Sequence, residues 1–145
     1  MPKSRGLTPA QDRYLAIIYS FDEQKRDITT GGLAKALGVT PASVSEALKF
    51  LESKKLVERR SWGKYALSQR GREIASRMSH NHRVLETYFV SVLGLNEGAA
   101  CEEASKIDML VGDGLVASMC RALSWPSVCV HGRPIHHGSC RGCER

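Results

Sequence analysis

The sequence predicts a mostly α-helical protein in which one short β-hairpin separates a first group of helices from a second. Apolar residues recur at helical spacing along most of the chain, whereas the stretch around residue 60 changes to the period of short strands about a glycine. The 145 residues are 42% hydrophobic and 25% charged, which is typical of a folded chain and excludes disorder throughout. This length allows one core or two small units that share one.

Two helices are expected at the start of the chain. Residues 8–21 form the first, with Thr8 as its N-cap, Pro9 at the first helical position and an apolar row of Tyr14, Ile17, Ile18 and Phe21. Residues 30–37 form a shorter second helix, and Gly38 is well placed to end it.

A third helix and a hairpin complete the first half. Thr40 is the expected N-cap and Pro41 the first residue of the helix, whose apolar row is Val44, Leu48 and Leu51. Residues 56–60 and 64–67 then form two short strands about a turn with glycine. Helix, tight turn, helix and hairpin together make a winged helix-turn-helix pattern.

The second half is expected to be helical up to residue 124. Ser68 can cap a long helix that ends at Gly94 and carries an apolar stripe of Ile74, Met78, Leu85, Phe89 and Val92. Two further helices cover about 97–111 and 113–124, after which Trp125 and Pro126 close the helical part. The remaining residues contain too little apolar material for a core of their own.

We therefore expect a winged helix-turn-helix domain at 1–72, a helical domain at 73–125 and a Cys/His-rich tail at 126–145. Charge distinguishes the first of these, because residues 1–72 contain fourteen Lys and Arg against seven acids, whereas residues 73–145 contain seven against eight. A positive excess confined to one half predicts a polyanion partner for that half. No apolar run approaches the roughly 18 to 20 residues that a membrane-spanning helix needs. We expect a cytoplasmic protein without membrane contact.

The third helix and the hairpin carry the candidate DNA contacts. A helix that reads base edges needs small or hydrogen-bonding side chains at its N-terminus and cations nearby for phosphate. The predicted DNA-binding residues are Thr40, Pro41, Ala42, Ser43, Ser45, Lys49, Arg59, Arg60 and Lys64. An ordinary helical core with solvated charges is the alternative, which the order of the elements and the uneven charge disfavour.

All five cysteines lie beyond residue 100. In a chain without a signal peptide, such cysteines are more often metal ligands or redox groups than a disulfide framework. Cys140 and Cys143 form a C-x-x-C unit, to which Cys129, Cys120 and Cys101 can add thiolates, with His131, His136 and His137 as competing ligands. On ligand grounds, four cysteines suit an iron–sulfur cluster or zinc equally. A flexible tail that binds metal weakly and a core position for Cys120 are the alternatives.

From residue 7 to about residue 123, the chain resembles the metal-dependent repressors of the diphtheria toxin repressor and manganese transport regulator family (DtxR/MntR). The segments that carry the resemblance are YLAIIY (14–19), VTPASVS (39–45), LSQRG (67–71), HRVLE (82–86) and LGL (93–95). Residues 129–135 are similar to the segment with which many members end or pass to a further domain. The resemblance implies a homodimer whose winged domains bind a palindromic operator and whose following helices form the dimer interface and the metal sites.

The resemblance also indicates metal ligands. His82 and Glu86 match family ligand positions, and Cys101 falls where iron-responsive members have a histidine; from the residues alone, a buried histidine beside an acid is the alternative. A second family site falls on Arg13, Ser105, Asp108 and Met109. A guanidinium cannot bind a cation, so we expect that iron or manganese site to be absent. We therefore favour an iron–sulfur cluster at the cysteines, because a regulator that has lost its divalent-iron site could still report iron or redox state in that way. The predicted metal ligands are His82, Glu86, Cys101, Cys129, Cys140 and Cys143.

The sequence thus predicts a DNA-binding transcriptional regulator, not an enzyme, that responds to iron, another metal or redox state. Its expected cofactor is an iron–sulfur cluster or a divalent transition metal ion, namely iron, zinc or manganese. A regulator with structural zinc is one alternative. A thiol oxidoreductase that uses the C-x-x-C unit is another, although the chain lacks the strand–helix setting in which such motifs work.

Overall fold

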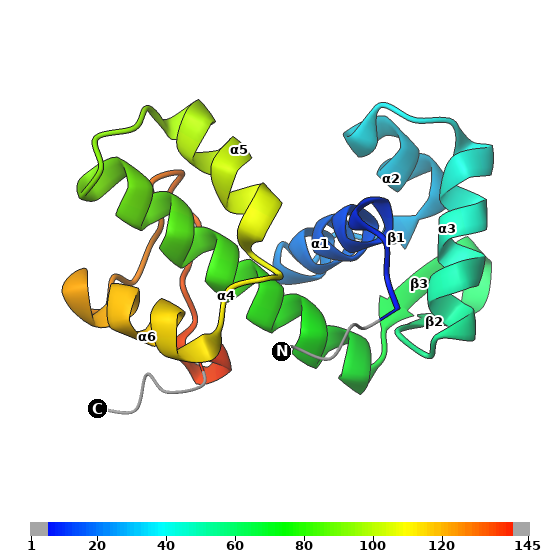
Figure 1. The fold of residues 1–145 in the computed structure, drawn as a ribbon. Coiled ribbons are helices and arrows are strands. Elements are labelled where there is room, and N and C mark those ends of the chain that lie inside the picture. The colour runs from blue at the N-terminus through cyan, green and yellow to red at the C-terminus, as the bar shows by residue number, and fades with distance from the viewer. Residues whose placement is uncertain (1–5, 141–145) are drawn as a thin grey trace. The chain divides into compact units, whose positions relative to one another are not determined.

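The computed structural model describes residues 6–140, and its contacts divide the chain into two compact units that meet between Ala75 and Ser76. We call residues 6–75 the N-terminal unit and residues 76–140 the C-terminal unit (Figure 1). The boundary falls inside the longest helix, α4 (Gln69–Ser91), so one continuous helix belongs to both units.

The N-terminal unit is a three-helix arrangement with a three-stranded antiparallel sheet. Its elements are α1 (Pro9–Glu23), β1 (Ile28–Thr29), α2 (Thr30–Leu37), α3 (Pro41–Ser53), β2 (Val57–Arg59), β3 (Lys64–Leu67) and the start of α4. The strands are ordered β1-β3-β2, with Val57 opposite Leu67 and Ile28 opposite Tyr65. The helix-turn-helix and the hairpin are confirmed; β1, which is only two residues long, adds a strand that no sequence period indicated.

Local caps explain where these helices begin and end. Thr8 and Gln11 form a reciprocal capping box at α1, and the side chain of Thr40 accepts a hydrogen bond from the Ser43 amide at 3.2 Å to begin α3. Gly38 ends α2 in the left-handed conformation, with φ 66°. The apolar rows of the three helices meet in one core, whose fully buried members include Leu15, Ile18, Phe21, Leu33, Leu48 and Leu51.

The start of α4 lies directly against the chain before β2. Ser68 accepts a hydrogen bond from the Gly71 amide at 2.9 Å and donates its hydroxyl to the carbonyl of Lys55 at 2.7 Å. A side-chain carbon at position 71 would lie only 1.9 Å from the carbonyl oxygen of Leu56. Glycine is therefore required where this helix crosses the strand connection.

The C-terminal unit contains the rest of α4, α5 (Glu97–Ile107), α6 (Asp113–Ala122) and the tail. The two later helices end before the residues predicted from periodicity, 111 and 124. Gly112 is the N-cap of α6, and the positive φ angles of Ser124 (58°) and Trp125 (51°) prevent that helix from continuing.

The tail completes the core of the C-terminal unit. Residues 127–135 form a tight hairpin with a bridge between Val128 and Pro134, and the buried guanidinium of Arg83 donates to the carbonyl of Pro134 at 2.7 Å. Cys129 and Ile135 are buried with Val84, Val116, Ala117 and Cys120. The tail thus has no core of its own, as expected, but it is packed against α4 and α6. None of the helices in residues 6–140 has the length and apolarity needed to cross a membrane.

Candidate functional site

The N-terminal end of α3 presents a small, polar surface. Pro41, Ala42 and Ser43 are exposed, while Val44 between them and Ser45 points into the core. Thr40 is exposed too, but its hydroxyl is engaged by the Ser43 amide and lies 2.9 Å from the Ser43 hydroxyl. Lys49 is exposed two turns further along the helix. Of the predicted DNA contacts on α3 and at its N-cap, Ser45 is half-buried and the others are exposed.

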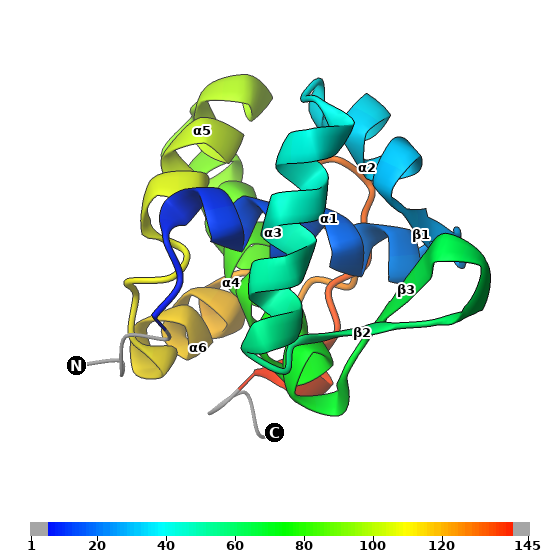
Figure 2. The ribbon, with the colours of Figure 1, turned by 90° about the vertical axis from the view of Figure 1, so that its right-hand side faces the viewer.

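The hairpin of β2 and β3 lies beside α3 (Figure 2). It carries three exposed cations. Arg59 pairs with Glu52 at 3.7 Å, Arg60 with Glu58 at 3.0 Å and Lys64 with Asp27 at 3.0 Å. Ion pairs this exposed contribute little to stability. A phosphate group can therefore take the place of the carboxylate at each cation.

Trp62, at the tip of the hairpin, is the feature of this surface that sequence reasoning missed. Its side chain is 95% exposed, and its backbone adopts the left-handed conformation, with φ 62°. An aromatic residue in a turn between Arg60 and Lys64 was the available signal, because aromatic rings interleaved with cations are typical of nucleic-acid-binding surfaces.

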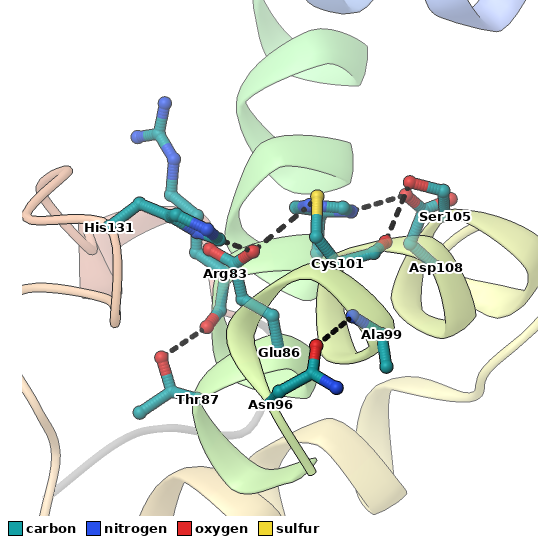
Figure 3. A network of polar contacts seen from close by, with 10 residues as sticks. Arg83, Glu86, Thr87, Asn96, Ala99, Cys101, Ser105, Asp108 and His131 are labelled. Atoms are coloured by element: carbon teal, nitrogen blue, oxygen red, sulfur yellow. Dashed lines mark hydrogen bonds and ion pairs between the residues drawn. The ribbon is translucent and has the colours of Figure 1, made fainter. Parts of the chain in front are cut away.

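Three potential metal ligands converge in the C-terminal unit. His82 and Glu86 lie one turn apart on α4, with Nε2 of His82 3.4 Å from Oε2 of Glu86, and Cys101 on α5 lies with its Sγ 3.5 Å from the same ring nitrogen. The donor atoms of the three residues lie within 4.8 Å of one another. The carboxylate of Glu86 is buried, with 2% of the residue exposed. Figure 3 shows Cys101 and Glu86 facing each other from the two helices.

A second set of donors shares Glu86. Nδ1 of His131 lies 3.1 Å from Oε2 of Glu86, and the buried Cys129 thiol hydrogen bonds to the same carboxylate. Both residues come from the tail hairpin, and Figure 3 shows His131 beside Glu86. The sequence predicted Cys129 as a metal ligand and His131 only as a competing ligand. The C-x-H spacing of these two residues is the sequence signal that favours His131.

The cysteines of residues 6–140 do not gather into one set. Each of the three potential metal-binding groups in residues 6–140 contains a single cysteine, namely Cys101, Cys120 or Cys129, and these three are free thiols. Cys140 is disulfide-bonded, and Cys143 lies outside the described residues. The part of the chain that the structure describes therefore offers mixed histidine, carboxylate and thiol sites, and it does not assemble the four-thiolate set on which the iron–sulfur prediction depended.

The residues predicted to fall on a second family site make other contacts. Oδ2 of Asp108 accepts a hydrogen bond from Nδ1 of His82 at 3.2 Å, and the Ser105 hydroxyl donates to the carbonyl of Cys101 at 2.9 Å (Figure 3). Asp108 thus orients His82, as carboxylates often do behind a metal-binding histidine. Arg13 is exposed on α1.

The electrostatics of the site depend on these carboxylates. Burial of His82 disfavours its protonation, but hydrogen bonds to Asp108 and Glu86 outweigh burial and raise the pKa of His82 to about 10. Burial raises the pKa of Glu86, but its contacts with His82, Cys129 and His131 outweigh burial and hold that pKa below the usual value. The site is therefore a buried, charged network in which a proton on His82 occupies the position that a metal ion can take.

Two family models match the chain. One, described as the iron dependent repressor N-terminal DNA binding domain, matches residues 6–61, and the other, described as the iron dependent repressor metal binding and dimerisation domain, matches residues 68–137. The chain belongs to the iron-dependent repressor family. Members of this family are metal-dependent transcriptional regulators that bind DNA, and they are not enzymes.

Individual relatives agree with this assignment. An uncharacterized helix-turn-helix transcriptional regulator of Methanocaldococcus jannaschii is 33% identical over 111 residues, which cover 76% of this chain and 89% of the relative. The transcriptional regulator MntR of Oceanobacillus iheyensis is 27% identical over 101 residues, or 70% of this chain and 68% of the relative. The structure of the manganese regulator SloR superposes with a TM-score of 0.73 at 29% identity and covers 90% of this chain, which spans 64% of SloR.

Proposed function

We propose that the protein is a homodimeric repressor whose affinity for a palindromic operator depends on a divalent transition metal ion held by His82, Glu86 and Cys101. The observation that carries this proposal is the convergence of those three donors from α4 and α5 in a chain whose other unit is a winged helix-turn-helix. Asp108 behind His82, and His131 beside Glu86, provide further polar groups at the same place.

The donor types suit a single metal ion. Imidazole, carboxylate and thiolate together are typical ligands of iron(II) or zinc, whereas manganese prefers oxygen donors. When bound, the ion would supply positive charge beside the buried carboxylate of Glu86 and a link between α4 and α5. We therefore favour a divalent ion over an iron–sulfur cluster and place iron or zinc before manganese.

The exposed end of α3 and the hairpin are the proposed DNA-binding surface. Ser43 and Ala42 lie where base edges are read, and Lys49, Arg59, Arg60 and Lys64 provide cations for phosphate. Contacts with the DNA phosphates supply affinity, and contacts with the base edges supply preference for one sequence.

A second copy of the chain is the proposed partner of the C-terminal unit. That unit exposes several large apolar side chains, namely Val92, Leu93, Leu110, Leu115 and Val128. Burying such side chains against a partner is favourable. A two-fold dimer would present two copies of α3 to half-sites one helical turn apart, which is why we expect a palindromic operator.

The test is selection of bound sequences from a random pool of duplex DNA by the purified protein, followed by fluorescence anisotropy on the selected site. We expect a palindrome, and we expect added iron(II) or zinc to change the dissociation constant at least tenfold in the wild-type protein. His82→Gln should abolish that response, whereas His136→Gln, at an exposed histidine, should preserve it. Equal metal responses in the two variants would contradict the proposed sensor site.

A further inference from the structure

A third group of potential ligands lies apart from the sensor donors, in the interior of the C-terminal unit. His80 comes from α4, Cys120 from α6 and His137 from the tail, and their donor atoms lie within 4.8 Å of one another. His80 and Cys120 are buried and His137 is partly buried. None of the three belongs to the ligand positions of the proposed sensor site.

The ring of His137 is oriented as a metal ligand would be. Its Nε2 donates to the carbonyl of Pro126 at 2.9 Å, so that Nδ1 carries the lone pair, and Nδ1 lies 3.3 Å from the Sγ of Cys120. Zinc bonds of about 2.3 Å to sulfur and 2.0–2.1 Å to nitrogen, at a tetrahedral angle, place the two ligand atoms about 3.5 Å apart. The observed distance differs from this by only a few tenths of an ångström. A backbone carbonyl behind the outer nitrogen is a common support of ligating histidines.

His80 supplies an independent observation. Only 2% of the residue is exposed, and its Nε2 is buried without a hydrogen-bond partner in the described part of the chain. Its Nδ1 faces Oδ1 of Asn81 at 3.5 Å, whose amide group in turn donates to the carbonyl of Asp108 at 3.2 Å. An unpaired polar atom in the interior costs free energy, and such atoms often mark a missing ion. One nitrogen of each imidazole thus faces an oxygen, which leaves Nε2 of His80 and Nδ1 of His137 for a ligand bond.

We propose that His80, Cys120 and His137 bind a zinc ion that fastens the tail to α4 and α6. Two imidazoles and one thiolate are typical ligands of zinc, and they leave one position of its tetrahedron for a fourth ligand. Cys120 is a member of the buried apolar cluster that also contains Val84, Val116 and Ala117. It is a structural site, distinct from the sensor donors.

This site has a consequence for the sensor. The same tail that provides His137 provides Cys129 and His131, which contact Glu86. A zinc ion at His137 would hold the tail hairpin in place and thereby keep those two side chains beside Glu86. Ordering of one site by another metal is a coupling between them.

The experiment is a zinc titration of the purified full chain, in which bound zinc is measured after gel filtration and thermal unfolding is followed at each ratio. Cys120→Ala and His137→Gln test the site. His136→Gln is the matched control, because it removes the adjacent histidine, which is exposed and outside the donor group. Cobalt(II) serves as a spectroscopic substitute, since a thiolate ligand gives it a charge-transfer band.

We expect Cys120→Ala and His137→Gln each to bind one equivalent of zinc fewer than the wild type and His136→Gln, and to lose part of the zinc-dependent rise in unfolding temperature. The cobalt charge-transfer band should weaken only in Cys120→Ala and His137→Gln. His137 is only partly buried, so His137→Gln decides the question if Cys120→Ala does not fold. Equal zinc stoichiometry in folded His137→Gln and His136→Gln would overturn the proposal. Metal-dependent DNA binding through His82 is measured separately, so that failure of the zinc proposal and failure of the proposed sensor site can be told apart.

Discussion

The two units differ in where they place polar and charged side chains. In the N-terminal unit, the cations of the hairpin pair with acids at the surface, where Arg60 and Glu58 keep about half or more of their side chains exposed. The C-terminal unit instead buries His80, Asn81, Arg83, Glu86, Thr87 and Asp108. Exposed pairs are weak and can exchange a carboxylate for a phosphate, whereas buried polar groups must satisfy one another. The first arrangement suits a surface for a polyanion, and the second suits a site that one small ion can alter.

The comparison implies that the N-terminal unit is stabilised by close packing and local caps rather than by charge. Gly71→Ala tests this most severely, because the added carbon would lie 1.9 Å from the carbonyl oxygen of Leu56. We expect a loss of about 3 kcal/mol in the free energy of unfolding, measured by urea denaturation. Gly31→Ala is the control: nothing lies within 4 Å of its added carbon, and it should be neutral or stabilising. Similar losses in both variants would show that packing at Leu56 is not the cause.

The C-terminal unit should be most sensitive at Glu86, which both sets of sensor donors share. Glu86→Gln keeps the size of the side chain but removes its charge, and we expect the affinity for iron(II) or zinc at this site to fall at least about a hundredfold. Competition with a chromophoric chelator measures that affinity. Glu102→Gln, at an exposed position on α5, should leave it unchanged. An unaltered affinity in Glu86→Gln would remove this carboxylate from the site.

A smaller loss of stability is expected at the start of α3. The Thr40 side chain caps the helix, so Thr40→Ala should cost about 1 kcal/mol of unfolding free energy. Ser45→Ala, further along the same helix, should leave stability nearly unchanged, as chemical denaturation can check. If the two variants are equally stable, the cap does not contribute.

The smallest expected effect concerns single surface cations. Lys49→Ala should leave the free energy of unfolding within about 0.5 kcal/mol of the wild-type value. It should reduce the steepness with which log affinity for DNA falls against log salt concentration by about 1. Ser43→Ala should leave that slope unchanged and alter the preferred sequence instead. Anisotropy titrations at several salt concentrations distinguish the two. An unchanged slope in Lys49→Ala would mean that this lysine does not contact phosphate.

The same contrast explains which features the sequence could predict. The helices, the caps at Thr8 and Thr40 and the hairpin follow local rules, so they could be predicted to within a few residues. The pairing of His82 with Glu86 is also local, since four residues make one helical turn. The contacts of Glu86 with Cys129 and His131, and of His80 with Cys120 and His137, join segments forty or more residues apart, and no periodicity reports them. Without knowledge of these long-range contacts, the positions of the cysteines in the sequence favoured a cluster held by four thiolates.

The exposed ring of Trp62 provides a built-in optical probe. The chain has two tryptophans, and only Trp62 lies fully in water, while Trp125 is partly buried in the C-terminal unit. Fluorescence that a collisional quencher can reach should therefore come mainly from the hairpin tip. If the hairpin binds duplex DNA, that emission becomes shielded from the quencher. The rate of binding can then be followed without attaching any dye.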